Sequence, residues 1–204
     1  MEIKDRILQA AEALFMRNGI RSVSMDDIAT HLAMSKKTLY KWFENKDQIV
    51  LGVTKQHLGM EEAECCRMFA AAPHALDELF QMINWAKRQI QDVHPGIFYD
   101  LRKYYPAAWA LWEQHKNTFI LEKIGANLRR GMAEGLYRAD LNVDILSRLH
   151  LAEIELAFNA DLFPPKQFDA STVHFTFLEH FLLGVATLKG HKLINEYRHV
   201  TEEE

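Results

Sequence analysis

The sequence has little of what stabilises a small secreted fold or a membrane-spanning one. Its 204 residues include only two cysteines, the neighbours Cys65 and Cys66. Neighbouring cysteines rarely form a disulfide, so we expect a reducing compartment, the cytoplasm. There is no run of 18 uncharged apolar residues, which argues against a membrane span, and the charged start of the chain does not resemble a signal peptide.

The sequence also lacks the motifs of common enzyme classes. It has no glycine-rich phosphate-binding loop, no serine-hydrolase nucleophile motif and no zinc-protease helix motif. The ten histidines are scattered. His57 and Glu61 have a spacing that could hold a metal, yet such pairs arise readily on solvated helix faces. We therefore expect no catalysis, no cofactor and no metal site.

Apolar residues recur at helical spacing along nearly the whole chain, without strand-like alternation of useful length. This pattern predicts an all-α protein of about nine helices. We expect a helix-turn-helix domain of three helices at residues 1–48, with the motif itself at 24–43. A second helical domain should follow at 49–190, and a polar tail at 191–204.

Charge is distributed unevenly along the chain. The formal net charge of the whole chain is −4. Residues 1–50 hold eight Lys or Arg against seven Asp or Glu, and four of these eight bases lie between Lys36 and Lys46. A local basic patch on an otherwise acidic body can bind DNA phosphates while the body stays away from the DNA.

The caps of the short helices point to the same function. Ser24, with Asp27 three residues later, resembles a capping box, and Ser35 caps a next helix expected at 36–43. Lysine is unfavourable at the partially positive start of a helix, yet Lys36 and Lys37 stand there. A bound phosphate would make this arrangement favourable, so the pattern indicates an anion-binding surface.

The same logic extends to the next helix, where Lys46 directly follows an Asn45 cap. We expect Tyr40 to contact a phosphate, and Trp42 and Phe43 to be packing residues. The expected DNA contacts on these two helices are Lys36, Lys37, Thr38, Tyr40, Lys41 and Lys46.

The stretch RILQAAEALFMRNGIRSVSMDDIATHLAMSKKTLYKWFENKDQIV resembles the N-terminal domain of the TetR/AcrR family, and the run SKKTLYKWFENK is its specific part. The resemblance implies that residues 35–41 lie on a recognition helix and that Lys46 clamps a backbone phosphate. It adds Ser24 and Ser35 to the expected DNA contacts. Ala33 and Lys37 stand where family members often have glycine or another small residue, so we expect a variant turn and an altered operator preference.

The resemblance further implies a homodimer that binds double-stranded operator DNA in a sequence-specific way. It implies a repressor that a small-molecule effector releases, and control by a protein partner is the alternative. The last two helices, expected at 143–160 and 168–189, would form the dimer. Apolar residues lie on two sides of the first of them. We assign the side with Ile145 and Leu149 to the protomer's own core. The expected interface residues are Leu151, Ile154, Phe158, Phe177, Phe181 and Leu188.

The middle helices are rich in aromatic residues. Such stripes are usually plain core, but the resemblance adds a cavity for a small, largely apolar effector. Glu153 falls among apolar residues of its helix, where a carboxylate needs a partner: His150, a base of the neighbouring chain or a cationic or hydroxylated ligand. The expected lining is Phe80, Ile83, Phe98, Leu101, Trp109, Trp112, Phe119 and Glu153.

Overall fold

The computed structural model describes residues 2–90, 93–94, 96–157, 159, 161–164 and 166–198. These residues hold helices and no strand, with one isolated bridge between Tyr137 and Ala186. This confirms the all-α prediction. Among the same residues, no helix has both the length and the apolar character needed to span a membrane.

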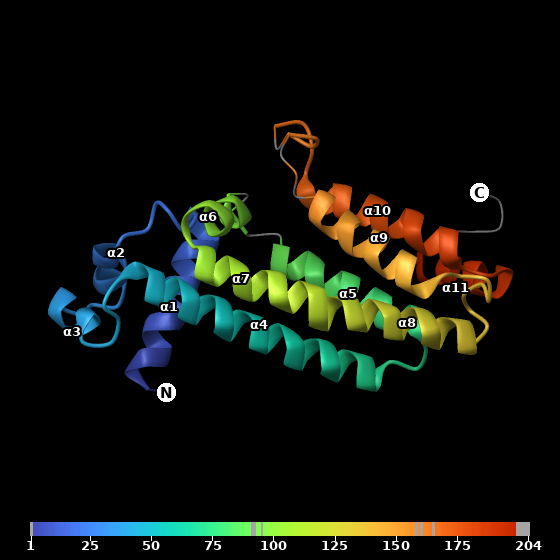
Figure 1. The fold of residues 1–204 in the computed structure, drawn as a ribbon, viewed down its shortest axis with the longest axis horizontal. Helices are drawn as coiled ribbons and strands as arrows, with labels where there is room; N and C mark the ends of the chain where they lie inside the picture. The colour runs from blue at the N-terminus through green and yellow to red at the C-terminus, as the bar shows by residue number, and fades with distance from the viewer. Residues whose placement is uncertain are drawn as a thin grey trace. The chain divides into compact units, whose positions relative to one another are not determined.

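The helices are labelled in Figure 1. They are α1 (Ile3–Asn18), α2 (Met25–His31), α3 (Lys36–Tyr40), α4 (Lys46–Ala71), α5 (Ala75–Ile90), α6 (Ile97–Tyr104), α7 (Pro106–His115), the π-helical turn η1 (Lys116–Ile120), α8 (Leu121–Ala133), α9 (Val143–Leu156), α10 (Ala170–Val185) and α11 (Leu188–Arg198). The chain forms two compact units, the described residues of 1–63 with 91–115 and those of 64–90 with 116–204.

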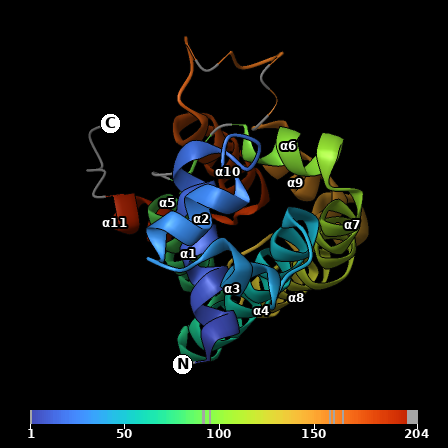
Figure 2. The same ribbon diagram turned by 90° about the vertical axis from the view of Figure 1, so that its left-hand side faces the viewer.

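The first unit contains α1, α2 and α3, the first part of α4, and α6 with α7. Figure 2 shows α1, α2 and α3 together at the front of the view. Ile7, Ile28, Leu39 and Ile49 come from four different helices and are fully buried in one core. This shared core anchors the short helices, which are too short to be stable alone. The expected boundary near residue 48 therefore does not separate compact units, and it stays a prediction about division of function.

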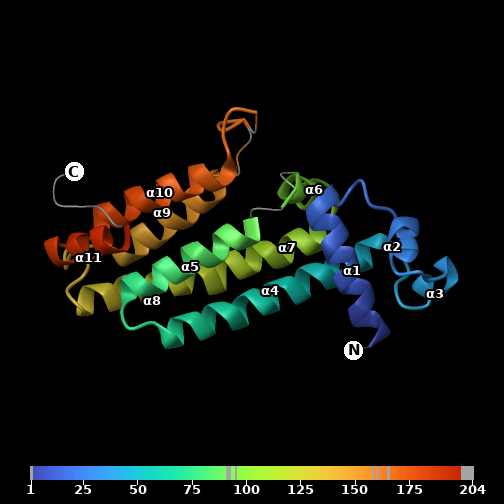
Figure 3. The same cartoon turned by 180° about the vertical axis from the view of Figure 1, so that it is seen from behind.

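The second unit contains α5, α8, α9, α10 and α11 with the end of α4. Within it, α8 packs against α5 and α9, and α9 packs against α10, as the view in Figure 3 also shows. A buried polar network lies in its core. The Asn127 amide donates to the Ala75 carbonyl at 2.8 Å and to Glu78 at 2.6 Å, and Arg130 forms an ion pair with Glu78. Buried polar groups are tolerated here because they satisfy one another.

The end of the chain differs from the prediction. The expected helix at 168–189 stops at Val185, because the Val185 carbonyl accepts a hydrogen bond from Arg138 N–H at 2.9 Å and the chain then turns. A further helix, α11, follows and runs to Arg198, so residues 191–198 are helical where we expected a polar tail. Tyr197 of α11 stacks on Phe80 at 4.3 Å between ring centres and donates to Asp77 at 2.7 Å. This extra helix and the interruption at η1 explain why the described residues hold more helices than the nine expected.

Candidate nucleic-acid interface

The helix-turn-helix begins at a complete capping box. The Ser24 hydroxyl accepts from Asp27 N–H at 3.1 Å, and the Asp27 carboxylate accepts from Ser24 N–H at 2.7 Å. Hydrogen bonds from the Ser24 side chain and backbone lower the pKa of Asp27. The cap that the sequence predicted is therefore present, and it fixes the start of α2 with Ser24 exposed to solvent.

The turn between α2 and α3 contains a left-handed residue. Ala33 has φ of 50°, and it is the only described residue other than glycine with a positive φ. Its N–H donates to Thr30 and the next N–H, of Met34, donates to Ala29, at 3.0 and 2.9 Å. Glycine adopts this conformation without steric cost, whereas a Cβ is unfavourable there. The turn thus has the left-handed backbone conformation that glycine usually adopts, but the residue in this conformation is alanine.

The third helix is shorter than predicted. Ser35 caps it, its hydroxyl accepting from Thr38 N–H at 3.1 Å, but the α-helix ends at Tyr40 and not at residue 43. The next bonds, from Lys41 N–H to Thr38 and from Trp42 N–H to Leu39, span three residues and tighten the chain into a turn. A helix of five residues carries a weak dipole, so charge and hydrogen-bond donors must account for most of any phosphate attraction.

The exposed side of α3 carries most of the expected contacts. Lys37 and Lys41 are exposed, and within the described residues neither forms an ion pair. Tyr40 is 44% exposed. Trp42, expected to be a packing residue, is 43% exposed, while Phe43 is buried at 3%. Both residues follow the end of α3, and Phe43 packs in the same core as Leu39, whereas Trp42 lies in the turn and stays exposed.

Lys36 is paired within the protein. Its Nζ lies 2.7 Å from Asp26 Oδ1, and this hydrogen bond with its charge raises the pKa of Lys36. A carboxylate of α2 therefore compensates the unfavourable positive charge at the start of α3. From the sequence we expected a bound phosphate to do this. Asp26 precedes Lys36 by ten residues, and no helical periodicity links the two positions.

Lys46 is half-buried at the start of α4. Its Nζ donates to the Arg21 carbonyl at 3.4 Å and lies 5.9 Å from the ring centres of Phe15 and Tyr105. Burial lowers the pKa of Lys46, and the charge of Asp100 opposes that effect. Lys46 thus sits against the turn between α1 and α2, and its phosphate contact stays a prediction.

The eight expected effector contacts fall in both units. In the first unit, the Phe98 and Trp112 rings lie 5.4 Å apart, and Leu101 packs on the core. Arg102 lies over the Trp109 ring at 6.0 Å. These four residues belong to α6 and α7, and their use as an effector site stays a prediction.

In the second unit, Phe80 is covered by Tyr197 and Ile83 packs on the second core. Lys123 Nζ lies 5.3 Å from the Phe119 ring centre. Glu153 meets His150, one of the partners that the sequence suggested, with 3.3 Å between Oε2 and Nδ1. A single cavity formed by all eight residues stays a prediction.

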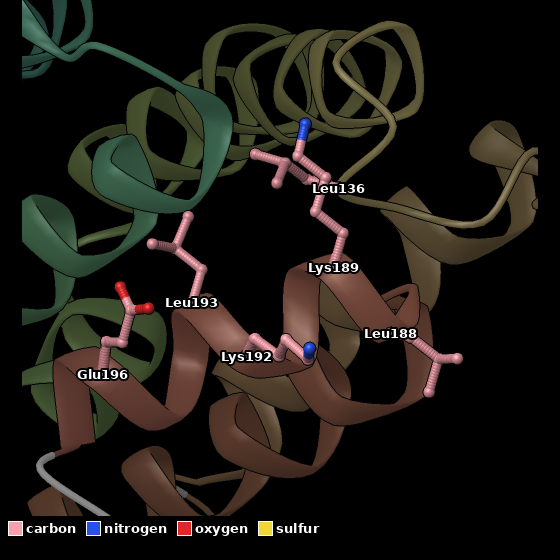
Figure 4. A pocket seen from close by; sticks show the side chains of 6 residues that line it. All are labelled: Leu136, Leu188, Lys189, Lys192, Leu193 and Glu196. Carbon is pink, nitrogen blue, oxygen red and sulfur yellow. The ribbon is translucent and has the colours of Figure 1, made fainter.

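Two surface hollows involve other residues. The one in Figure 4, of about 540 Å³, is lined by α11 side chains and Leu136. The other, of about 420 Å³, lies between the end of α4 and α5 and is lined by Glu64, Arg67, Met68, Ala71, Gln81, Asn84 and Arg88. In the described part of the chain, no group of three or more His, Cys, Asp or Glu is placed to hold a metal ion.

The two sides of α9 differ from the expectation in most of their residues. Leu151 of α9 and Phe181 of α10 are buried within the protomer, so they offer no surface to a partner. Ile154 and Phe177 are partly exposed, Leu188 is 84% exposed, and Phe158 lies outside the described residues. On the side assigned to the core, most apolar residues are exposed instead, whereas Leu146 packs on the second core and Ala157 is buried.

The reason lies in two buried polar residues. Ser147 donates to the Val143 carbonyl at 2.7 Å, and the His150 ring stacks on Phe181 with 4.1 Å between centres. Both side chains find partners inside the protomer and turn their side of α9 inward. Hydrophobicity alone favoured the other side. The exposed α9 stripe consists of Ile145, Leu149, Ala152 and Leu156.

Comparison with known proteins agrees with this architecture. Residues 7–53 match the model of bacterial regulatory proteins, tetR family. The HTH-type transcriptional regulator YvaF of Bacillus subtilis, described as uncharacterized, is 26% identical over 172 residues, which are 82% of this chain and 87% of YvaF. The HTH-type transcriptional repressor KstR2 of Mycolicibacterium smegmatis is 24% identical over 152 residues, 71% of this chain and 72% of KstR2.

The fold is also that of a solved regulator. The crystal structure of a putative transcriptional regulator from Saccharomonospora viridis in complex with choline matches with a TM-score of 0.73 and 17% identity, over 90% of this chain and 97% of that one. The family match thus covers the helix-turn-helix, and the fold match extends over the remaining helices. Residues 7–53 therefore form a DNA-binding domain of the tetR family of bacterial regulatory proteins, and the chain as a whole is similar to transcriptional regulators of that family, which are DNA-binding proteins and not enzymes.

Proposed function

We propose that the protein is a homodimeric repressor that binds a near-palindromic operator through α3 of each protomer. The observation that carries this proposal is the exposed side of α3, where Lys37, Tyr40 and Lys41 face solvent while Leu39 is anchored in the core. Two such helices would enter major grooves one turn apart, or a multiple of it. Repression is supported by the similarity to KstR2, itself named a repressor. We accordingly expect the protein in the cytoplasm, where the bacterial chromosome lies.

Different residues would position the protein and read the sequence. Lys37 and Lys41 are exposed cations on the helix that would enter the groove, so they are suited to base edges as well as phosphates. Ser24 and Ser35 already serve as caps, and the Thr38 hydroxyl lies 2.7 Å from the Ser35 hydroxyl; all three hydroxyls would add phosphate contacts. Lys46 and Tyr40 would bind backbone phosphates.

Operator binding at several salt concentrations tests these roles. Lys46→Ala should weaken binding to all sequences similarly and lower the slope of log affinity against log salt by about one. Lys37→Ala should instead change which bases are preferred at one position of each half-site. Wild-type affinity, salt slope and preference in both variants would contradict the assignment.

The dimer would form through the α9 stripe. Its residues are spaced by four, three and four, so they lie on one side of the helix, and Ile145 is 62% exposed. Thr176 and Gly184 are exposed on α10, and small residues there would let a partner helix approach closely. An apolar stripe on an otherwise charged surface is favourable only when it is covered.

We further propose that a small, largely apolar effector lowers operator affinity by favouring a conformation that no longer fits the operator. The S. viridis regulator with the same fold was crystallised with choline, which supports small-molecule control. Dodecyltrimethylammonium and dodecanoate, with alkyl chains of similar length and opposite head charges, are suitable probes.

If Glu153 contacts the effector, the cationic probe should release the operator at lower concentration, and Glu153→Gln should abolish that difference. Release by neither probe would contradict an effector with a single apolar chain. Release by a purified protein encoded beside the regulator would favour the alternative, control by a protein partner.

A further inference from the structure

The turn between α1 and α2 is tied to α6 by a buried carboxylate. Asp100 of α6 is 8% exposed, and its Oδ2 accepts a hydrogen bond from the backbone N–H of Arg21 at 2.9 Å. Arg21 lies in the turn, three residues before the Ser24 cap. A buried carboxylate is costly unless hydrogen bonds compensate it, so this contact constrains both partners.

Arg21 is held through its other groups as well. Its Nη1 donates to the Tyr104 hydroxyl at 3.1 Å, and its guanidinium lies 5.1 Å from the centre of the Tyr104 ring. Its carbonyl accepts from Lys46 Nζ at 3.4 Å. One residue of the turn therefore contacts the α6 residues Asp100 and Tyr104 on one side and the first residue of α4 on the other.

These contacts connect α6 to two of the predicted DNA-binding positions. The hydrogen bond to the Arg21 carbonyl positions the Lys46 ammonium, and Ser24 follows Arg21 along the same short turn. If the Arg21 backbone shifts, the Lys46 ammonium loses its acceptor and the start of α2 moves with the turn. We infer that Asp100 is a positioning residue for the DNA-binding face, acting through Arg21 on Lys46 and on the Ser24 cap.

Two simpler roles for Asp100 must be separated from this one. Asp100 lies in the first turn of α6, where a carboxylate stabilises the helix start. It also adds negative charge near Lys46, which by itself would weaken DNA binding. Neither role depends on the hydrogen bond to Arg21, so two variants that both lose the charge, one keeping the acceptor and one losing it, distinguish them.

Asp100→Asn and Asp100→Ala form that pair. Both remove the charge, but only alanine removes the acceptor for Arg21 N–H. Because the lost charge is negative, the asparagine variant should bind operator DNA as tightly as the wild type or more tightly. The alanine variant should bind about fivefold to tenfold more weakly than the asparagine variant, as expected for one lost hydrogen bond.

The position of Lys46 gives a second readout. Labelling of lysines with an amine-reactive reagent, followed by peptide mapping, should show Lys46 labelled faster in Asp100→Ala than in Asp100→Asn. Lys123, in the second unit, serves as an internal control and should be labelled equally in both. A role limited to helix stability would lower the melting temperature without a selective change at Lys46.

The inference rests on the proposed DNA-binding function, and the outcomes keep the two apart. Failure of the wild type to bind any operator would overturn the function. Operator binding by the wild type with equal affinity and equal Lys46 labelling in the two variants would overturn only the role of Asp100. If Asp100→Ala does not fold, two other measurements test the role of Asp100. One is the operator affinity of Tyr104→Phe, which removes only the hydroxyl bonded to Arg21. The other is hydrogen exchange of the wild-type Arg21 amide. Fast exchange of that amide with unchanged Tyr104→Phe affinity would overturn the role.

Discussion

The ammonium of Lys36 lies 2.7 Å from Oδ1 of Asp26, so the first lysine of α3 has a carboxylate partner in the free protein. Both side chains are more than half exposed, and such pairs contribute little to stability. The pair nevertheless affects DNA binding, because Lys36 must exchange Asp26 for a phosphate before it can contribute a contact.

Asp26→Asn should therefore strengthen DNA binding. The change removes a negative charge from the DNA-facing domain and frees Lys36, so affinity should rise severalfold for all sequences, with a steeper salt dependence. Fluorescence anisotropy at several salt concentrations measures both quantities. In a Lys36→Ala background, Asp26→Asn should give a smaller gain, because only the loss of negative charge then contributes; an equal gain would show that Lys36 is not its source.

Ala33→Gly should stabilise the protein, because the left-handed conformation at φ of 50° disfavours a Cβ. The expected gain is about 1 kcal/mol in the free energy of unfolding, measured by urea titration. Ala29, buried within α2, provides the matched control: Ala29→Gly should destabilise the protein, since glycine is unfavourable inside a helix. Destabilisation by both changes would mean that residue 33 is not left-handed in solution.

The buried His174 predicts a defined pH dependence of stability. Burial, together with the charge of His150, lowers the pKa of His174 to about 4. The unfolded chain therefore binds a proton at this residue before the folded chain does. The stability cost should be absent above the unfolded value of about 6.5 and should grow as pH falls from there toward 4. His174→Asn should flatten that part of the stability curve.

His57 predicts the opposite slope and serves as the comparison. A hydrogen bond to Glu12 raises its pKa above the ordinary value, with Glu61 also nearby. Its stabilising contribution should be complete below about pH 6.5 and should disappear as pH rises through the raised value. The stability difference between wild type and His57→Gln, measured across that range, should shrink with rising pH. A difference that grows with pH would contradict the Glu12 contact.

The α9 stripe predicts the residues that control dimerisation. Leu149→Glu should produce a monomer in sedimentation velocity while leaving the helix content unchanged, because Leu149 is exposed in the protomer. Leu151→Glu should unfold the second unit, because Leu151 is buried there. A dimer that survives Leu149→Glu and Ile145→Glu would show that another surface forms the interface.

The sequence predicted the elements that depend on local signals. The Ser24 and Ser35 caps and the basic α3 follow from local sequence signals. Contacts between distant segments were not predictable in this way. Asp26 with Lys36 and Asp100 with Arg21 join different helices, and no periodicity marks either pair.

The predictions of the α9 orientation and of the last helix were wrong for a related reason. A hydrophobicity pattern places polar residues such as His150 and Ser147 at the surface, but partners within the protomer allow them to be buried. The break after Val185 depends on a hydrogen bond from Arg138, almost fifty residues earlier in the chain. Local patterns cannot contain such information, whereas the caps and the basic surface are entirely local.

Selection from a pool of random double-stranded DNA tests the central claim most directly. The wild-type protein should enrich a near-palindromic sequence, and the double variant Lys37→Ala, Lys41→Ala should fail to enrich it although its melting temperature is unchanged. A wild-type protein that enriches no sequence, or a double variant that enriches the same one equally well, would contradict sequence-specific DNA binding through α3.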